Sequence, residues 1–558
     1  MARFKNFIVL FYFIFSSLLV SVESSPTTTV NIPMRDGKEL IADIYLPEAE
    51  AEKLPCILLR SPAGRKANTW LHFAELAKSG YAVVIQDTRS AMDPEGKTVP
   101  YLSDGWGELQ DGYDTVQWLA QSKWTNGQIG TLGFSALGIT QLMLAPSAPP
   151  ALKCQYIGVA ASDLYHHAIF LGGQVLKDQV EGWLRWYAKD PSVHGYLCSQ
   201  PFYNEFWSSF NTLAVAHRVQ VPALHYGGWF DIFIQGTIDG FKERQEKGGI
   251  GAKGTQKLLI GPWVHFWPKN IILGDFEVPE IGRKPPVDVT PKRWFDHYLK
   301  GIPNKIDEIP PITYYVMGPF DGTPSTGNVW RHANSWPIPA QETPFYLTAD
   351  QKLIPEIIPG LEKTYTYFYD PKNPVPTLGG RNLFLEAGPK DQRKNEQRSD
   401  VLVFTSEPME EDLEVTGRIT AKLFFSSDRS NTDVVVWLTD VYPDGRSILI
   451  ADGIHSTGYH ACLQNKTDRD PSIPNEVDID LWSTSIVFAK GHSIRVAVSS
   501  SNYPRYEKNL NIGLIGNQIE QMEIAKNNIH VGPKMSSHLI LPLVRRGNQI
   551  LVTSQEKQ

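Results

Sequence analysis

The amino-acid sequence predicts an α/β domain with a mainly parallel sheet, a helical insertion within that domain, and an all-β domain after it. In the first 340 residues, short apolar runs alternate with stretches of helical spacing, which is typical of a parallel sheet with helices on both faces. Between about residues 145 and 220 the pattern becomes aromatic and helical. After about residue 343 short strands and turns recur at regular spacing, which indicates a β-sandwich.

The α/β domain begins with a hairpin, which six candidate strands follow. Apolar and polar residues alternate around Asp36 and Gly37, a dipeptide that favours a tight hairpin turn. The stretch DGYDTVQWLAQSKW (111–124) has the spacing of a helix and lies between the second and third candidate strands. The six runs are LPCILLR (54–60), YAVVIQD (81–87), GQIGTLGF (127–134), VPALHY (221–226), KLLIG (257–261) and ITYYVMG (312–318).

These changes of pattern divide the chain into parts. A chain of 558 residues is too long for one hydrophobic core, so several domains are expected. We expect residues 25–145 and 221–340 to form the α/β core. Residues 146–220 are then a helical cap inserted into this core, and residues 341–558 form the β domain.

The composition excludes some functional classes. The formal net charge is −7 and no long run of Lys or Arg occurs, so nucleic acid is not an expected partner. The four cysteines form no C-x-x-C motif, and no H-E-x-x-H motif is present, so the sequence predicts neither a metal site nor a cofactor.

The first 24 residues have the pattern of a secretory signal peptide. A basic start precedes an apolar run from about Phe7 to Val22, and small residues follow at a candidate cleavage site. The alternative is an uncleaved membrane anchor, but Ser16 and Ser17 interrupt the run. We therefore expect a secreted or periplasmic protein that has no membrane attachment after cleavage.

A candidate nucleophile follows the third apolar run. In GQIGTLGFSALGITQLML (127–144), Ser135 stands between a predicted strand and a predicted helix, with Gly133 and Gly138 near it. A serine on such a turn is lifted above the end of its strand, and small neighbours leave room for the turn. The alternative is a serine that only caps the helix.

A serine hydroxyl needs a base, and the base needs an acid that orients it. Asp231 follows VPALHY through GGWFD, and His265 follows KLLI through GPWVH. Both positions lie just beyond the carboxyl ends of predicted strands, where open α/β sheets place their sites. Spacing alone leaves rivals for these two roles, which are Asp239, His225 and His297.

The chain resembles the cocaine-esterase and X-prolyl dipeptidyl-peptidase family of α/β hydrolases over nearly everything after the leader. The motifs that carry the resemblance are the segment around Ser135, GGWFDIF, GPWVH, RWFDHYLKG, DVLVFTSEPMEEDLEVTG, TDVYPDGRS and SSSNYPRYEKNLN. The resemblance implies an α/β hydrolase core with an inserted helical cap and a carboxy-terminal jelly roll. It also implies a catalytic triad of Ser135, Asp231 and His265.

Two positions depart from the family pattern near the expected oxyanion hole. Ala136 stands where many members have a tyrosine, but its backbone N–H can still bind the oxyanion. Ala63, in Arg60-Ser61-Pro62-Ala63, replaces a tyrosine whose hydroxyl is the second donor in relatives of the cocaine-esterase type. The loss of such a donor typically costs roughly 2.7–4 kcal/mol in the transition state.

The sequence therefore predicts a secreted serine hydrolase that cleaves an ester or amide of a small acyl group through an acyl-enzyme. Phe233, Trp183 and Trp186 are candidate substrate-binding residues. One alternative is a dipeptidyl-peptidase for X-Pro peptides. The resemblance also implies that members which require a free α-amino group need carboxylates near the nucleophile, and Asp163, Asp178 or Glu181 of the cap could supply them. A second alternative is a non-catalytic binding protein with a hydrolase-like fold, which Ala63 favours slightly and the complete triad argues against.

Overall fold

The computed structural model describes most of the chain. The described residues are 25–48, 53–187, 190, 192–265, 272–319, 321–357, 359–459, 463–513 and 521–545. The predicted signal peptide, residues 1–24, lies outside them. No helix within the described ranges combines the length and apolar character needed to cross a bilayer.

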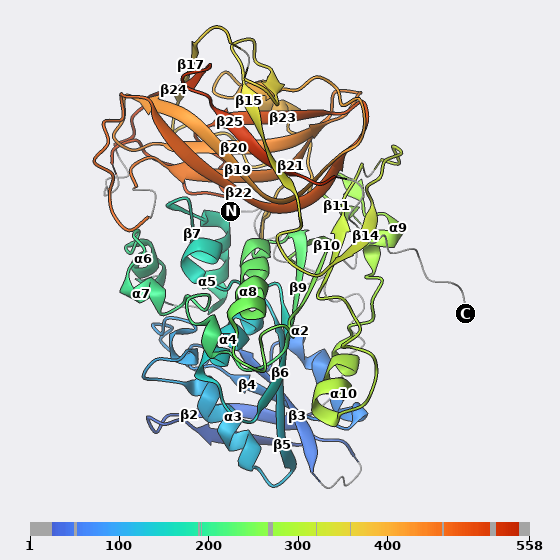
Figure 1. Cartoon of the computed structure of the whole chain (residues 1–558). Coiled ribbons are helices and arrows are strands. Elements are labelled where there is room, and N and C mark those ends of the chain that lie inside the picture. Colours follow the sequence, from blue (N-terminus) through green and yellow to red (C-terminus); the bar gives the residue numbers. More distant parts are fainter. Residues whose placement is uncertain are drawn as a thin grey trace.

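A mainly parallel sheet of ten strands forms the lower part of the molecule in Figure 1. All neighbours from β4 to β13 are parallel, and antiparallel strands flank them at both edges. The strands, in spatial order, are β1 (Thr28–Pro33), β2 (Glu39–Tyr45), β4 (Ala82–Asp87), β3 (Leu54–Ser61), β5 (Thr125–Phe134), β6 (Leu152–Gly158), β9 (Ala223–Phe230), β10 (Lys257–Val264), β13 (Ile312–Val316) and β14 (Val329–Ala333).

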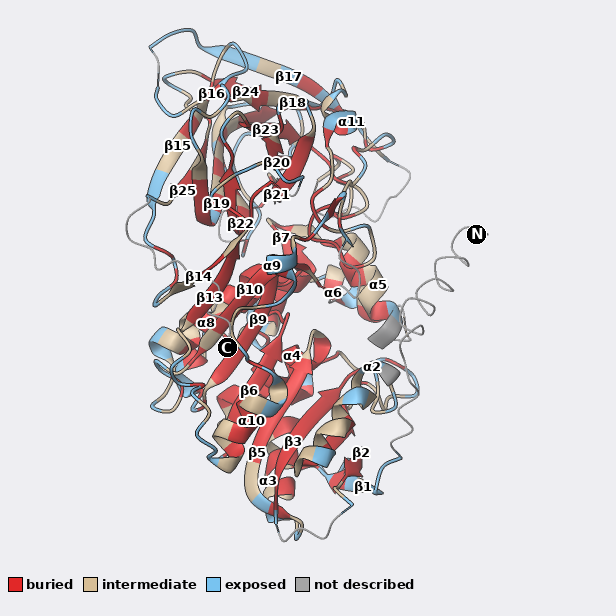
Figure 2. Cartoon of the chain, turned by 90° about the vertical axis from the view of Figure 1, so that its right-hand side faces the viewer, coloured by how far each residue is buried: buried red, intermediate tan, exposed pale blue. Residues whose placement is uncertain are grey.

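Helices cover both faces of this sheet. Adjacent strand residues point to opposite faces, and in β5 the side chain of Thr131 bonds to Gln141 of α4, whereas Gly130 faces Phe295 of α10. The sheet is therefore buried on both sides, as Figure 2 shows by its colour. The helices that pack here are η1 (His72–Ser79), α3 (Asp111–Gln121), α4 (Ala136–Leu144), α8 (Ile234–Lys247) and α10 (Pro291–Lys300).

The segment predicted as a helical cap, residues 146–220, begins differently from our expectation. Its first part forms β6, which lies inside the sheet between β5 and β9. Sequence reading missed β6 because its buried Gln155 breaks the apolar run, and the partners of Gln155 are distant in sequence. Its amide donates to the Thr131 hydroxyl and accepts from Arg244.

The inserted segment follows β6 and returns to the sheet at β9. It is mostly helical and aromatic, and it lies between the sheet and the β domain in Figure 1. Its elements are η4 (Tyr165–Ile169), β7 (Phe170–Leu171), β8 (Gln174–Val175), α5 (Lys177–Tyr187), α6 (Ser192–Cys198), α7 (Glu205–Ser208) and η5 (Ala216–Arg218).

The carboxy-terminal part is mostly strand and contains two antiparallel sheets. One has the order β16-β15-β25-β19-β24-β17 with β22 also paired to β19, and the other has the order β18-β23-β20-β21. Their strands are β15 (Gln341–Leu347), β16 (Leu353–Ile354), β17 (Lys363–Tyr369), β18 (Leu402–Thr405), β19 (Leu413–Ser427), β20 (Asp433–Val441), β21 (Ser447–Ser456), β22 (Asn475–Phe488), β23 (Ser493–Ser499), β24 (Ala525–Val531) and β25 (His538–Leu543).

Small elements complete the described chain. They are α2 (Asn68–Leu71), η2 (Leu102–Asp104), η3 (Ala145–Ser147), β11 (Ile272–Leu273), β12 (Phe276–Glu277), α9 (Glu280–Arg283) and α11 (Arg393–Glu396).

Backbone hydrogen bonds join the β domain to the α/β core. Met317, which follows β13, donates its N–H to the Ser485 carbonyl at 3.0 Å and accepts from the Val487 N–H at 2.8 Å. One contiguous apolar core includes residues of the sheet, the inserted segment and the β domain, among them Ile157 and Trp207. The three parts therefore pack as one body.

Candidate active site

The backbone at Ser135 is strained in the way that exposes a nucleophile. Ser135 lies between β5 and α4 with φ 56° and ψ −122°, backbone angles that residues other than glycine rarely adopt. Its N–H donates to the Gly158 carbonyl of β6 at 2.9 Å, which fixes the turn. Ser135 is half-buried. A strand, a strained turn and a helix in this order form a nucleophile elbow.

The two glycines near Ser135 are required by close contacts. A Cβ added to Gly133 would lie 2.4 Å from the Cβ of Leu137, and one added to Gly138 would lie 2.7 Å from the Cβ of Ala160. Both distances are shorter than real Cβ contacts, so larger residues would push the helix away from the strand. The glycine pattern therefore allows the tight turn that Ser135 occupies.

His265 and Asp231 complete a hydrogen-bonded series with Ser135. His265 Nε2 lies 2.8 Å from the Ser135 Oγ, and His265 Nδ1 lies 2.6 Å from Asp231 Oδ2. The other carboxylate oxygen of Asp231 accepts the N–H of Phe233 at 2.7 Å. Asp231 is fully buried and His265 is 6% exposed. The acid therefore orients the imidazole, and the imidazole can accept the serine proton.

Two tryptophans hold the strand ends that carry the acid and the base. Trp229 in GGWFD donates its indole N–H to the Tyr315 carbonyl at 2.6 Å, and Trp263 in GPWVH donates to the Gly282 carbonyl at 3.0 Å. Gly228 allows β9 to approach β10, because a Cβ there would lie 2.3 Å from the Trp263 carbonyl oxygen. These motif residues thus set the separation of the two loops.

The three rivals that spacing left open lie in other contacts. Asp239 is 3.3 Å from His167, His225 is 3.2 Å from the Gln256 side chain, and His297 is 3.2 Å from Asp307.

The backbone N–H of Ala136 is placed for an oxyanion. Ala136 is the first residue of α4, so no carbonyl of the helix can accept its N–H. A helix N-terminus also favours negative charge. The structure therefore places Ala136 at the N-terminus of α4, next to Ser135, and its role as the first oxyanion donor stays a prediction.

The loop that carries Ala63 lies beside the elbow but presents no side-chain donor there. β3 and β5 are parallel with Leu58 opposite Thr131, so both strands end at the same edge of the sheet. Ala63 is exposed on the turn after β3. The next residue but one, Arg65, fixes this turn through ion pairs with Asp43 (3.1 Å) and Asp87.

The three candidate substrate-binding residues differ in their contacts. Phe233 packs edge-on against the ring of His265, with the ring centroids 5.4 Å apart. Trp183 on α5 is half-buried and stacks on Tyr101 at 5.8 Å. Trp186 also belongs to α5, but its side chain lies outside the described atoms. The structure therefore places Phe233 against His265, and the substrate-binding roles of Phe233 and both tryptophans stay predictions.

The three carboxylates considered for recognition of an amino group all have partners. Asp163 contacts His166 at 2.8 Å, Asp178 accepts the N–H of Phe384 at 3.1 Å, and Glu181 pairs with Lys177 at 2.5 Å. None of the three offers an unengaged carboxylate to a substrate ammonium group.

A buried amide that the sequence did not single out supports the elbow. Gln141 of α4 donates to the carbonyls of Gly133, Leu137 and Tyr156, and it accepts from Thr131. A single polar residue with a long side chain in the apolar run ALGITQLML was the available signal.

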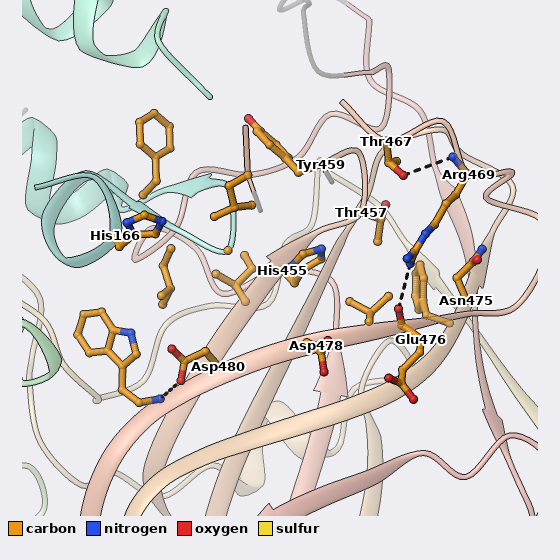
Figure 3. Close-up of a pocket in the computed structure, with 18 of the residues that line it drawn as sticks. His166, His455, Thr457, Tyr459, Thr467, Arg469, Asn475, Glu476, Asp478 and Asp480 are labelled. Carbon is orange, nitrogen blue, oxygen red and sulfur yellow. Dashed lines mark hydrogen bonds between the residues drawn. The ribbon is translucent and has the colours of Figure 1, made fainter. Parts of the chain in front are cut away.

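A separate cavity of about 810 Å³ lies between the inserted segment and the β domain (Figure 3). Ser135, Asp231 and His265 are not among the residues that line it. Its walls carry charges of both signs, including Asp478 and Arg469. In the described part of the chain, no group of three or more His, Cys, Asp or Glu side chains is arranged to hold a metal ion.

A strained serine at the carboxyl edge of a parallel sheet, hydrogen-bonded to a histidine and a buried aspartate, is the arrangement of the α/β serine hydrolases. Comparisons with known proteins agree. Residues 36–194 and 184–267 match the model of the X-Pro dipeptidyl-peptidase (S15 family), and residues 304–540 match the X-Pro dipeptidyl-peptidase C-terminal non-catalytic domain. The cocaine esterase of Rhodococcus sp. (strain MB1 Bresler) is 32% identical over 95% of this chain and all of its own length.

The chain therefore belongs to the cocaine esterase and X-Pro dipeptidyl-peptidase (S15) family, and it is a hydrolase of the serine type. Solved structures share the fold. An aminopeptidase from a marine sediment Thaumarchaeota archaeon is 24% identical with a TM-score of 0.77 and covers 93% of this chain and 96% of its own. An alpha-amino acid ester hydrolase is 23% identical with a TM-score of 0.76 and covers 95% of this chain and 100% of its own.

Proposed function

We propose that this protein hydrolyses esters of small carboxylic acids through an acyl-enzyme on Ser135. The observation that carries the proposal is the continuous series of hydrogen bonds from Ser135 through His265 to the buried Asp231. The strained backbone of Ser135 at the end of β5 also supports its role as the nucleophile. The catalytic part of the proposal rests on this chain's own geometry, and the choice of ester rests on the departures described above.

The geometry supports a two-step mechanism. His265 Nε2 removes the proton of the Ser135 hydroxyl as the oxygen attacks the substrate carbonyl, and Asp231 stabilises the imidazolium that forms. The N–H of Ala136 donates to the oxyanion of the tetrahedral intermediate. His265 then protonates the leaving alcohol, and a water molecule activated by the same histidine hydrolyses the acyl-enzyme.

Two features support an ester rather than an X-Pro peptide as the substrate. Ala63 supplies no hydroxyl to the oxyanion, and the poor leaving group of an amide makes that loss more serious. The carboxylates of Asp163, Asp178 and Glu181 already have hydrogen-bond partners within the protein, so they are not free to bind a substrate ammonium group. The X-Pro dipeptidyl-peptidase alternative is kept because the matching family model bears that description.

The proposal extends to the architecture around the site and to export. We infer that the inserted segment from η4 to η5 acts as a cap over the active site and that the two carboxy-terminal sheets have a jelly-roll topology. We also propose export, which is supported by the composition of residues 1–24. In the mature, exported protein, sequencing of the amino terminus should begin near Ser25.

A labelling experiment tests the proposed function. A fluorophosphonate probe should modify wild-type protein at Ser135, and Ser135→Ala should lose both labelling and ester hydrolysis while keeping its fold. Short-chain aryl esters should be cleaved much faster than X-Pro amides. A protein that is folded but not labelled would instead support the non-catalytic binding alternative, and faster cleavage of X-Pro amides would support the peptidase.

A further inference from the structure

The junction between the core and the β domain contains a bulge in β22. Arg418 of β19 pairs with Ser483, and Thr420 pairs with Asp480, so two residues of β22 oppose one of β19. These two residues are Leu481 and Trp482, and Trp482 has φ 65° and is buried. Bulges bend a strand and redirect its backbone groups, often with a functional purpose. Here the bulge directs the N–H of Ser483 toward the α/β core.

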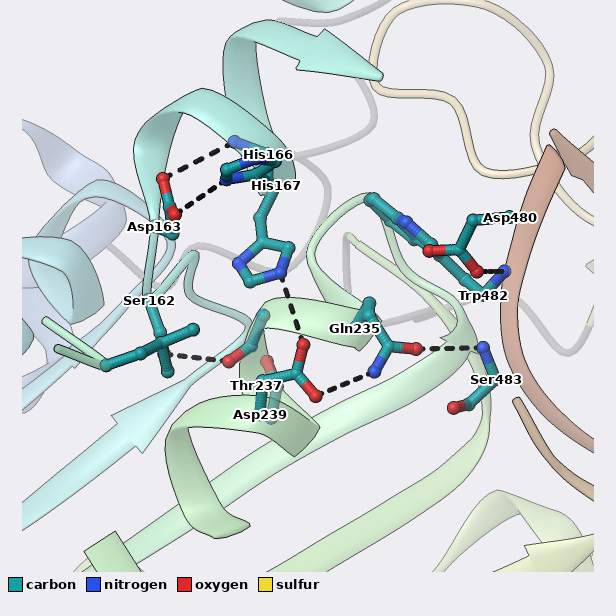
Figure 4. A network of polar contacts seen from close by, with 12 residues as sticks. Ser162, Asp163, His166, His167, Gln235, Thr237, Asp239, Asp480, Trp482 and Ser483 are labelled. Atoms are coloured by element: carbon teal, nitrogen blue, oxygen red, sulfur yellow. Dashed lines mark hydrogen bonds and ion pairs between the residues drawn. The ribbon is translucent and has the colours of Figure 1, made fainter. Parts of the chain in front are cut away.

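Gln235 of α8 receives that backbone. Its Oε1 accepts the N–H of Ser483 at 2.9 Å, and its Nε2 donates to Asp239 Oδ1 at 2.8 Å (Figure 4). Gln235 is only 2% exposed and Ser483 is fully buried. The hydrogen bond to Ser483 is therefore made away from water, where an unmade bond costs about 1–3 kcal/mol, whereas the bond to Asp239 is partly buried.

Asp239 extends this contact to the inserted segment. Its other oxygen, Oδ2, lies 3.3 Å from His167 Nε2 of η4 and 3.9 Å from Arg418 of β19. Burial raises the pKa of Asp239, but the hydrogen bond from His167 and the charges of His167 and Arg418 outweigh burial and lower it. The ring of Trp482 packs edge-on against His167. One turn of α8 is thus held by the β domain and by the inserted segment.

This turn of α8 follows directly after the triad acid. The N–H of Ile234 donates to the Asp231 carbonyl at 3.3 Å, and the N–H of Phe233 donates to Asp231 Oδ1 at 2.7 Å. Gln235 is the next residue of the helix. A displacement of the first turn of α8 would therefore move Asp231 relative to His265, whose Nδ1 lies 2.6 Å from the carboxylate.

We propose that Gln235 is a positioning residue through which the bulge of β22 fixes the catalytic Asp231. The inference rests on the proposed function, because it assigns Asp231 the role of triad acid. The β domain then takes part in catalysis without touching substrate. Gln235 acts on the orientation of the imidazole, so its loss should lower kcat and leave KM nearly unchanged.

The first test compares two buried glutamines. Gln235→Met removes both hydrogen bonds with little change of shape. Gln392→Met is the matched control, since Gln392 is also 2% exposed and donates to the carbonyls of Leu378 and Lys390 within the β domain. We expect Gln235→Met to lower kcat on an aryl ester at least tenfold with KM within twofold. Gln392→Met should lower thermal stability but leave kcat within twofold.

The second test exchanges the donor and the acceptor between Gln235 and Asp239. Gln235→Glu alone places two carboxylates in contact and should lower kcat as Gln235→Met does. In the double variant Gln235→Glu with Asp239→Asn, the new amide can donate to the new carboxylate, and the Ser483 N–H keeps its acceptor. We expect kcat to return to within threefold of wild type. This pair decides the question even if Gln235→Met does not fold.

A spectroscopic measurement separates positioning from general destabilisation. The proton between His265 Nδ1 and Asp231 should give a far-downfield proton NMR signal that is lost in His265→Ala. The signal should shift or broaden in Gln235→Met and persist in Gln392→Met. An unchanged signal and kcat within twofold in Gln235→Met would overturn the inference, provided that Ser135→Ala is inactive. Activity in Ser135→Ala would instead overturn the proposed function itself.

Discussion

Replacement of Asp231 by asparagine should inactivate the enzyme while leaving its shape intact. Asp231 Oδ1 accepts the N–H of Phe233, and Oδ2 accepts from His265 Nδ1. An asparagine has one oxygen and one NH₂ group, so only one of these acceptors survives. If the oxygen faces His265, the NH₂ group meets the buried N–H of Phe233, which then lacks an acceptor at a cost of about 1–3 kcal/mol.

The favoured orientation therefore keeps the oxygen at Phe233 and turns the NH₂ group toward His265. Nδ1 must then be the acceptor, and the imidazole carries its proton on Nε2. This nitrogen lies 2.8 Å from the Ser135 Oγ and could only donate to it, so it no longer acts as the base. Triads with this wrong tautomer lose about 10⁴ in kcat, which corresponds to about 5 kcal/mol.

The assay is kcat on an aryl acetate, with thermal unfolding as the check on folding. Asp440→Asn is the matched control, because Asp440 forms a second buried pair with His492 at 2.9 Å in the β domain. It should lower stability without lowering kcat more than twofold. The reasoning is refuted if folded Asp231→Asn keeps kcat within tenfold of wild type.

Three further predictions follow from individual contacts. Gly133→Ala should lower the free energy of unfolding by about 1–3 kcal/mol and reduce kcat, because the new Cβ would lie 2.4 Å from the Cβ of Leu137. Gly107→Ala is the control, since no atom lies within 4 Å of a Cβ placed there. Equal effects of the two substitutions would contradict the contact argument. Ala63→Tyr should raise kcat/KM on an aryl ester at least tenfold, about 1.4 kcal/mol, and no rise would show that another donor already binds the oxyanion. Burial raises the pKa of Asp433 to about 6, so its contribution to stability is full below about pH 4 and is lost as the pH rises through 6. In urea unfolding, Asp433→Asn should therefore gain stability relative to wild type between pH 4.5 and 7.5, and a constant difference would contradict this.

Much of the α/β core could be predicted because its strands are apolar and because turn residues in the sequence mark where they end. The hairpin predicted around Asp36 and Gly37 is present, and the structure pairs Pro33 with Glu39 across it. The third apolar run ends one residue before Ser135 in both the prediction and the structure. Family membership was also predicted from the motifs and is confirmed by the comparisons.

Where sequence reading failed, the missing information was long-range pairing. The predicted run ends at Tyr226, but strand β9 continues to Phe230, because Gly228 allows close contact with Trp263 of β10. The link from Gln235 to Ser483 joins residues far apart in the chain, and neither residue belongs to a motif with a known spacing. Polar contacts of this kind leave no periodic signal.

The backbone bonds between Met317 and β22 also concern the order in which the protein is made. The strand that supplies Ser485 and Val487 is synthesised long after the segment that contains Ser135. A ribosome must therefore complete most of the polypeptide before the backbone groups of Met317 can acquire these partners. A chimera that exchanges only the segment after β14 with that of a distant relative must recreate this pairing, or the N–H and carbonyl of Met317 lose their hydrogen-bond partners.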